Sequence, residues 1–416
     1  MNPFDYNHPA RQDIFAGRSS ELEWVKQSFE KALYGQPSHL FLYGPRRMGK
    51  TSFLWHIKHL FQDFDGNPFL ILIVSVGDCR NLSDLTKKII ETLYLEVQSQ
   101  KNVVGKVVEF LRNNFRGIKI GEVGIEWNRE ESMFDEPRQF TRVLVQLWKK
   151  LAEAFKGLAI IVDETDPIIK DKRFAGEFIF SLKTFIEEIA EKGICELKFI
   201  ISALPELYEV IPEYNQHLLR IFDIKAIEQF DEDAARILLR NGLKLASKKK
   251  FGLWSDEKRF TEDFFSACFR ISDGIPYHLQ LIYHRAFELD DDGKLTEEDF
   301  DRAVFGHQKK EGVLDILHHV SFGPLYQRAK SASSRSERLL TVLSEVGGEL
   351  TLDDLQRHFP GVSRETLSSN MASLRSNDFL TPSKGQGIYT VSSKLCRCWI
   401  DRRVRKIPDK DICVGT

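Results

Sequence analysis

The chain has 416 residues, of which 42% are hydrophobic and 29% are charged, and its formal net charge is -2. These values are typical of a folded globular protein, and they exclude a collagen-like chain, a low-complexity chain and a protein that is basic throughout. At roughly 150 residues per domain, the length predicts about two or three domains.

Alternating helix-like and strand-like segments dominate the first half of the chain. Apolar residues recur at helical spacing in three segments, at residues 21–33 with Ser19 or Ser20 as the expected N-cap, at 51–64 and at 82–97. Nearly continuous apolar runs, typical of parallel strands buried on both faces, occupy residues 39–43, 69–76, 158–162 and 197–202. This alternation predicts right-handed crossovers and a doubly wound, parallel α/β sheet within residues 1–225.

One segment, residues 98–137, interrupts the alternation. Its sequence GIKIGEVGIEWNRE alternates apolar and polar residues around glycines, which is the pattern of two short antiparallel strands joined by a turn. We therefore expect a β-hairpin inserted into the α/β domain.

The loop between the first predicted strand and the following helix reads GPRRMGKT and fits the pattern G-x-x-x-x-G-K-[ST]. Glycines let the backbone approach a phosphate chain, and N–H groups at a helix N-terminus point toward it. Lys50 is expected to reach the β- and γ-phosphates, and the Thr51 hydroxyl is expected to bind Mg²⁺. The predicted nucleotide-binding residues of this loop are Gly44, Pro45, Arg46, Arg47, Met48, Gly49, Lys50, Thr51 and Ser52.

Two adjacent acids, Asp163 and Glu164, follow the apolar strand at residues 158–162. After a phosphate loop, such a pair predicts that Asp163 holds Mg²⁺ together with Thr51, and that Glu164 orients and activates the attacking water. The alternative is that these two acids only lie in a turn exposed to solvent and have no role in the reaction. Asp166 lies close by in sequence without an assigned role.

Two further polar residues are candidates for the reaction. Ser202 ends the next strand, where its hydroxyl is either a sensor for the γ-phosphate or a hydrogen-bonded strand-end serine. Arg220 is expected on a short strand farther along the chain. Its guanidinium is either an arginine finger for the nucleotide of a neighbouring protomer or a partner in a surface ion pair.

Five stretches together carry a family resemblance: FAGRSSELEWV at residues 15–25, GPRRMGKTS, IIVDETD, FIISALPE and DGIPYHLQLI. They resemble the P-loop ATPases of the STAND and archaeal-type group, which are related to the origin-recognition AAA+ ATPases. The resemblance covers about residues 10–290. It implies an AAA+/STAND-like fold with ATP and ADP as ligands, Gly17 and Arg18 beside the adenine, and Pro276 against the base or ribose.

One position departs from the origin-type pattern. The sensor arginine that those ATPases usually carry on a lid helix is missing, and His278 is the nearest cationic candidate. The alternative for His278 is a role in packing within the lid. This departure favours the STAND branch and implies slow hydrolysis.

Residues 226–325 are expected to form an α-helical lid, because helical segments with Asp or Thr at their starts follow one another there. The acidic run at residues 290–292 lacks the alternating ligands of a calcium loop, so it is interpreted as a helix connection.

Residues 326–416 change character and predict a winged helix, since three helices are followed by a glycine-tipped hairpin. From residue 326 to 410 there are 15 Lys and Arg residues against 9 Asp and Glu residues, a local positive excess that suits phosphate contacts. The predicted DNA-facing residues are Arg364, Ser368, Ser369, Arg375 and Lys384. The alternative is a winged helix that contacts protein.

The sequence therefore predicts a slow, Mg²⁺-dependent ATPase that acts as a switch, coupling its nucleotide state to double-stranded DNA binding or to assembly of a homo-oligomer. Replication, mobile-element targeting and defence are the expected contexts. The alternative is a STAND signalling scaffold, whose ATP-dependent oligomers and winged helix serve protein contacts. Either function predicts a protein partner or effector.

The N-terminal sequence, the apolar runs and the cysteine spacing bear on the compartment and redox state of the protein. No signal-like leader and no apolar run of about 18 residues is present. The six cysteines are scattered, and Cys396 and Cys398 lack zinc-site spacing. We expect a cytoplasmic protein with reduced thiols and no membrane partner.

Overall fold

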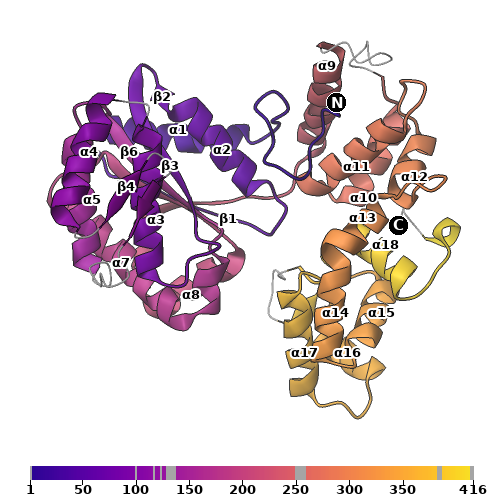
Figure 1. The fold of residues 1–416 in the computed structure, drawn as a ribbon. Coiled ribbons are helices and arrows are strands. Elements are labelled where there is room, and N and C mark those ends of the chain that lie inside the picture. The colour runs from indigo at the N-terminus through magenta and orange to yellow at the C-terminus, as the bar shows by residue number, and fades with distance from the viewer. Residues whose placement is uncertain are drawn as a thin grey trace. The chain divides into compact units, whose positions relative to one another are not determined.

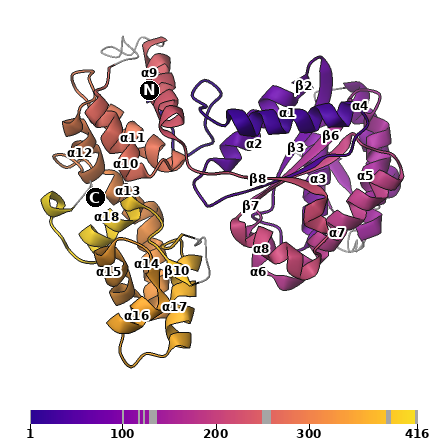
Figure 2. The same ribbon diagram turned by 180° about the vertical axis from the view of Figure 1, so that it is seen from behind.

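The computed structural model describes residues 2–98, 101–115, 118–121, 124–127, 137–248, 259–381 and 387–412. It forms two compact units, whose elements are labelled in Figure 1 and seen from behind in Figure 2. The α/β unit contains Arg18–Arg46 and Lys50–Glu228, and the helical unit contains Met1–Gly17, Arg47–Gly49 and Gln229–Thr416. Both the predicted lid and the predicted winged helix lie in the helical unit, so their boundary near residue 325 stays a prediction.

The α/β unit is built on a sheet whose described strands run in the order β2-β3-β6-β7-β1-β8. The five longer strands pair in parallel, and only β2 is antiparallel to its neighbour β3. This arrangement confirms the predicted α/β fold with a parallel sheet. The strands are β1 (His39–Tyr43), β2 (Asp63–Phe64), β3 (Asn67–Ser75), β6 (Gly157–Asp163), β7 (Leu197–Ala203) and β8 (Phe222–Ala226).

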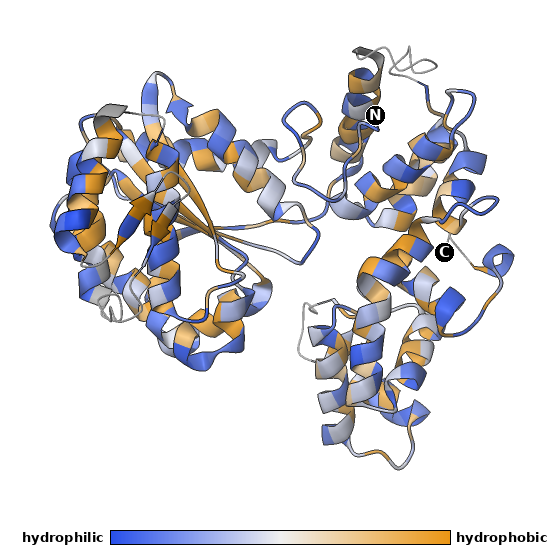
Figure 3. Ribbon diagram, in the orientation of Figure 1, coloured by the Kyte–Doolittle hydropathy of each residue, from blue (hydrophilic) through white to orange (hydrophobic). Residues whose placement is uncertain are grey.

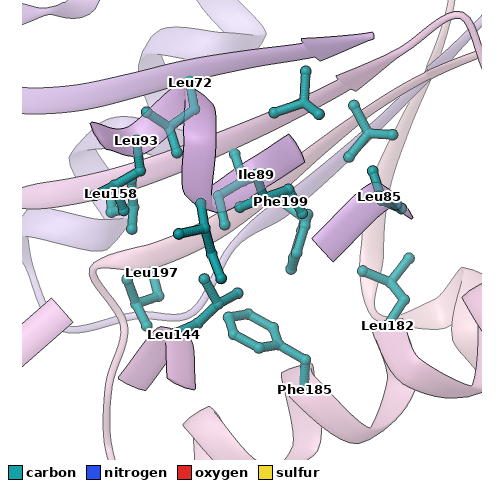
Figure 4. Close-up of a cluster of buried hydrophobic side chains, with 14 of the residues drawn as sticks. Leu72, Leu85, Ile89, Leu93, Leu144, Leu158, Leu182, Phe185, Leu197 and Phe199 are labelled. Carbon is teal, nitrogen blue, oxygen red and sulfur yellow. The ribbon is translucent and has the colours of Figure 1, made fainter. Parts of the chain in front are cut away.

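Helices flank this sheet, and their apolar sides face it while polar residues face outward, as the colours of Figure 3 show. In Figure 4, strand residues Leu72, Leu158 and Phe199 meet Ile89 and Leu93 of the helix α3. The rings of Phe185 and Phe199 pack edge to face with centroids 4.9 Å apart. The helices are α1 (Ser19–Leu33), α2 (Lys50–Phe61), α3 (Leu82–Val97), α5 (Pro137–Leu151), α6 (Asp166–Lys170), α7 (Lys172–Glu191) and α8 (Pro205–Tyr214).

Two predicted boundaries are wrong. The helix α1 already starts at Ser19, and its N-cap is Arg18 in the left-handed conformation, with φ at 68° and no side-chain cap. The helix expected over residues 51–64 ends at Phe61, because Asp65 and Gly66 both have positive φ and turn the chain into the β2–β3 hairpin.

The segment at residues 98–137 contains the helix α4 (Lys101–Asn114) and the strands β4 (Lys119–Gly121) and β5 (Gly124–Glu126). The two strands pair antiparallel. The hydroxyl of Tyr94 on α3 donates a hydrogen bond of 3.1 Å to the Gly121 carbonyl, so the strand pair lies against α3.

In the first part of the helical unit, the described residues form mainly helices. Its elements are α9 (Glu232–Lys248), α10 (Glu262–Ser272), α11 (Pro276–Leu289), α12 (Glu297–Phe305), α13 (Val313–Leu317), the π-helix His318–Phe322, α14 (Gly323–Ala332), α15 (Ser336–Val346), α16 (Leu352–His358), α17 (Arg364–Ser376) and α18 (Lys394–Arg403). Side chains cap several of them as their sequences indicate. Thr261 caps α10, and Thr296 with Asp299 forms a capping box on α12.

The last part of this unit carries the elements expected of a winged helix. After α15, the strand β9 (Leu350–Thr351) pairs antiparallel with β10 (Ile388–Tyr389), and α16 and α17 lie between them in sequence. An antiparallel bridge between Leu380 and Val391 joins the two arms of the predicted hairpin. The hairpin tip, with Lys384, lies outside the described residues.

Within the described residues, every helix is too short or too polar to cross a lipid bilayer.

A buried lysine lies in the sheet of the α/β unit. Lys198 on β7 is 1% exposed, and its ammonium donates hydrogen bonds to the carbonyl and hydroxyl oxygens of Ser28, at 2.7 and 2.8 Å. Burial, helped by the nearby Lys31 and opposed by Asp223, lowers the pKa of Lys198 to about 7. The folded protein therefore binds the Lys198 proton less tightly than the unfolded chain does.

This difference predicts how stability depends on pH. Between pH 7 and the ordinary lysine pKa of 10.5, the unfolded chain holds the proton that Lys198 has lost, so the free energy of unfolding rises with pH. Compared with Lys198→Met, the wild type should gain stability from about pH 7 to about 9.5, by up to about 1.4 kcal/mol per pH unit. Urea unfolding measures this difference, with the surface variant Lys192→Met as control. A constant difference between wild type and Lys198→Met would contradict the assignment.

Candidate nucleotide-binding site

Polar side chains gather where the parallel strands of the α/β unit end. Ser75 at the end of β3 pairs in register with Asp163 at the end of β6. On the other side of β6, Val162 pairs with Ile201 of β7, so Ser202 lies next along that strand. Ser202 is in turn opposite Leu42 of β1, the strand that leads into the loop at residues 44–49. One edge of the sheet thus carries the loop, a serine, an acid pair and a second serine in order.

The loop has the local structure that the sequence predicts, because it connects the strand β1 directly to the helix α2. Gly44 lies against the chain that follows β8, where an added Cβ would be 2.3 Å from the Ile227 carbonyl oxygen. No other residue fits there without moving the backbone. Gly49 has φ at 78°, which also favours glycine, and Arg47 has φ at 70°.

The side chain of Lys50 is folded back onto this loop. Its ammonium donates to the carbonyl oxygens of Gly44 and Pro45, at 2.7 and 2.8 Å. Burial lowers the pKa of Lys50 to about 8; Asp163, Asp166 and Glu206 oppose that shift, and Arg46 adds to it. Arg46 is ion-paired with Asp166. A bound phosphate would offer Lys50 charged acceptors in place of two neutral carbonyls.

The first residues of α2 reach the acidic strand end. The Thr51 hydroxyl donates a hydrogen bond of 2.8 Å to a carboxylate oxygen of Asp163, which is 5% exposed. Within the described ranges, no three His, Cys, Asp or Glu side chains are grouped to hold a metal. One carboxylate beside one hydroxyl fits Mg²⁺, which usually completes its octahedron with waters and phosphate oxygens. Thr51 and Asp163 are therefore the residues that would hold this ion.

Glu164 has an unusual conformation and a partner that the sequence analysis missed. Its φ is 55°, in the left-handed region that few non-glycine residues adopt. Its carboxylate accepts a hydrogen bond from the Ser75 hydroxyl and lies so close to Gly77 that an added Cβ there would be 2.7 Å from one oxygen. The carboxylate is thus turned toward the β3 side of β6. The sequence feature that could have revealed this partner is Ser75, the first polar residue of the run FLILIVS.

Ser202 is buried at 1% exposure, and its hydroxyl oxygen has no hydrogen-bond partner among the described residues. Buried hydroxyls are usually paired, so this orphan is the kind of group that a bound ligand or water would satisfy. The alternative of a hydrogen-bonded strand-end serine would require a water molecule as the partner of its side chain. The sensor role of Ser202 stays a prediction.

Arg220 does not lie on a strand, so that expectation is wrong. It ends the 3-10 turn Leu218–Arg220, and β8 begins only at Phe222. Because β8 is parallel to β1, Arg220 lies at the sheet edge opposite the phosphate loop, about 17 Å of strand away. Its side chain is exposed and makes no ion pair within the described chain, so the surface ion-pair alternative finds no support.

The residues expected beside the base lie in both units. In the α/β unit, the Arg18 guanidinium bonds the Glu228 carbonyl at 2.7 Å and the Glu21 carboxylate at 3.2 Å. In the helical unit, Gly17 has φ at 67°. Pro276 begins α11 and lies near Gly49, where an added Cβ would be 3.8 Å away. Arg47 also belongs to this unit, with its guanidinium bonded to the Ser321 hydroxyl.

The burial of His278 favours the packing role over that of a cationic candidate. The side chain is 1% exposed, and neither ring nitrogen has a hydrogen-bond partner among the described residues. Burial, helped by the charge of Arg47 and opposed by the Ser272 backbone, lowers the pKa of His278 to about 3. At neutral pH this imidazole cannot replace the missing sensor arginine as a positive charge.

The predicted DNA-facing residues of α17 do not all share one side of the helix. Arg364, Ser368 and Arg375 are spaced so that they lie along one flank, whereas Ser369 lies about 100° farther round. Arg364 is exposed and ion-paired with Asp353 of α16, and Ser368 and Arg375 are half-buried. Lys384 lies outside the described residues.

Comparisons with known proteins agree with this fold. No protein-family model matches the chain. An uncharacterised HTH-type transcriptional regulator of Methanocaldococcus jannaschii is 21% identical over 420 residues, covering 95% of this chain and 91% of that protein. The structure is similar to a Walker-type ATPase of Pyrococcus abyssi, with TM-score 0.58, 16% identity, and coverage of 96% of this chain and 99% of that one.

A second similar structure is the ORC2 protein of Aeropyrum pernix, solved in ADPNP–ADP complexes, with TM-score 0.56, 14% identity and 97% coverage of both chains. At these identities the likeness establishes the fold alone, a parallel α/β sheet with a phosphate loop followed by helical elements. Assignment to the STAND branch stays a prediction.

The low pKa of Lys50 predicts a pH dependence of nucleotide binding. The ammonium is present below about pH 8 in the free protein and is lost above it, while phosphates would restore it. The affinity for an ATP analogue should therefore weaken as pH rises from about 8 to about 9.5, by up to about tenfold per pH unit. Isothermal titration measures the affinity. The Lys50→Ala variant should bind the analogue more weakly, and its affinity should not depend on pH in this range. An equally steep pH dependence in that variant would show that a group other than Lys50 loses the proton.

Proposed function

We propose that this chain is a slow, Mg²⁺-dependent ATPase that serves as a nucleotide switch. The observation that carries the proposal is the contact between Thr51 and Asp163 beside Lys50, because it joins a phosphate loop to an acidic strand end. A hydroxyl, a carboxylate and a lysine in this arrangement are what Mg²⁺ and the β- and γ-phosphates of a nucleoside triphosphate require. The AAA+ fold supports the same interpretation.

Each residue has a task in this proposal. Lys50 leaves the Gly44 and Pro45 carbonyls for the phosphates, and the loop N–H groups bind the same oxygens. Bound Mg²⁺ would neutralise charge that develops on the phosphates, and Thr51 and Asp163 are the side chains that would hold it. Glu164 is the predicted water-activating acid, and Ser202 is the predicted sensor, whose unpaired hydroxyl supports that role.

Slow turnover is proposed because two cationic candidates, His278 and Arg220, are not available to the nucleotide of their own chain. His278 is neutral, and Arg220 lies at the opposite edge of the sheet from its own loop. Arg220 is therefore proposed as a finger for the nucleotide of a neighbouring protomer, which its exposure supports. On this account, assembly of an ATP-dependent homo-oligomer accelerates hydrolysis.

Adenine nucleotides and the STAND branch are proposed from the motif resemblance, with Gly17, Arg18 and Pro276 near the base or ribose. The three-part division into an ATPase core at residues 1–225, a lid at 226–325 and a winged helix at 326–416 belongs to the same proposal. ATP binding is proposed to set the state of the winged helix.

Double-stranded DNA is the proposed partner of the winged helix. The flank of α17 with Arg364, Ser368 and Arg375 supports this, and so does the excess of Lys and Arg in this segment. The relative from Methanocaldococcus jannaschii is named an HTH-type transcriptional regulator, which points the same way. A signalling scaffold with a protein-binding winged helix is the competing outcome.

The DNA partner predicts a salt-dependent stimulation. Steady-state ATP hydrolysis should rise when duplex DNA is added at about 50 mM salt and should lose that rise at about 200 mM salt. Arg364→Ala combined with Arg375→Ala should weaken duplex binding and lower its salt slope by about two. The control is Arg112→Ala combined with Arg173→Ala, which removes the same charge from the α/β unit. Turnover that ignores DNA would favour the protein-binding alternative, and turnover equal to that of Lys50→Ala would contradict the ATPase.

A further inference from the structure

The phosphate loop carries two arginines, at positions where its sequence pattern allows any residue. Arg47 belongs to the helical unit, whereas Arg46 belongs to the α/β unit together with Lys50, Thr51 and Asp163. The position of the Arg46 side chain can therefore be compared directly with the other groups of the candidate site.

An ion pair between Arg46 and Asp166 ties the loop to the acidic strand end. Arg46 follows β1 and Asp166 follows β6, and β7 lies between these two strands in the sheet. The guanidinium is thus held on the side of the loop that faces Asp163, the predicted Mg²⁺ ligand three residues before Asp166. Because the metal ion in such sites bridges the β- and γ-phosphates, this is the side on which the γ-phosphate is expected.

The ion pair is weak enough to be exchanged for a ligand. The side chains of Arg46 and Asp166 are 47% and 24% exposed, and an ion pair this open to solvent contributes little to folding stability. Both charges also act on the Lys50 ammonium, with opposite effects on its pKa. The loop therefore holds a second cation near Lys50, and a phosphate would replace its carboxylate partner at small cost.

A guanidinium suits a terminal phosphate. Its planar fork of N–H groups matches two phosphate oxygens at once, and it keeps its charge above pH 8, where Lys50 begins to lose its own. The loop N–H groups bind the α- and β-phosphates that ATP and ADP share. An additional cation on the γ-phosphate side would therefore favour ATP over ADP.

We propose that Arg46 makes the site prefer ATP to ADP, because its guanidinium exchanges the Asp166 carboxylate for oxygens of the γ-phosphate. This inference rests on the proposed ATPase function and assigns to one side chain the recognition of the triphosphate. The exchange also breaks the tie between the loop and Asp166, the first residue of α6. The ATP and ADP states of the switch thus differ at this contact.

The test measures the affinities of wild type and Arg46→Met for ADP and for the β,γ-imido analogue of ATP, both with Mg²⁺, by isothermal titration. Affinity for the analogue should fall about 10- to 100-fold, as expected for the loss of hydrogen bonds to a charged group, while affinity for ADP changes less than about threefold. The matched control is Arg173→Met, which breaks an ion pair with Glu177 on α7 and should leave both affinities within about twofold of wild type.

Two further variants separate a binding role from a structural one. Arg46→Lys keeps the charge without the fork and should recover part of the lost preference for the ATP analogue. Asp166→Asn frees the guanidinium, so it should tighten binding of the analogue, by up to about fivefold.

Three results would count against this assignment. Equal losses of affinity for the analogue and for ADP in Arg46→Met, or no loss of either, would overturn the inference while leaving the ATPase intact. Weaker binding of the analogue by Asp166→Asn would overturn the exchange. A wild type that binds neither nucleotide would instead overturn both the proposed function and the role of Arg46.

Discussion

The hydrogen bond between Thr51 and Asp163 holds the candidate site together. Thr51 is in the helix that follows β1, whereas Asp163 ends β6, and β7 lies between these two strands. The strand spacing of about 4.8 Å means that the loop and the start of α2 must reach back across one strand. Gly44 makes this path possible, because only a residue without a Cβ can lie against the Ile227 carbonyl. The same strand order determines the positions of Ser75 and Ser202 at this edge of the sheet.

That order also places Glu164 beside β3, where its carboxylate accepts a hydrogen bond from the Ser75 hydroxyl. Three acids near Lys50 favour its ammonium form, yet burial still lowers the pKa of Lys50 to about 8. Such a lysine suits a switch, since its charge is most stable when a phosphate is present. Hydrolysis without a partner is slow on this account because the neutral His278 adds no positive charge.

The features that could be predicted from the sequence are those set by local patterns. The phosphate loop, the acidic strand end and the buried strands are each encoded within about ten residues, and the structure has them nearly where expected. The missed features depend on which strands become neighbours. Ser75 and Glu164 are 89 residues apart, and the alternation of helices and strands does not determine that β3 adjoins β6. Arg220 was misplaced for a different, local reason, because it ends the 3-10 turn Leu218–Arg220 and β8 begins only at Phe222.

The central claim is that this edge of the sheet binds a Mg²⁺–nucleotide complex, and the most direct measurement is the structure of the protein with Mg²⁺ and a non-hydrolysable ATP analogue. The account predicts that the Lys50 ammonium leaves the Gly44 and Pro45 carbonyls for the β- and γ-phosphates, with the ion bound between Thr51 and Asp163. A protein that takes up no nucleotide, or one in which Lys50 keeps its carbonyl partners while the nucleotide binds elsewhere, would contradict it.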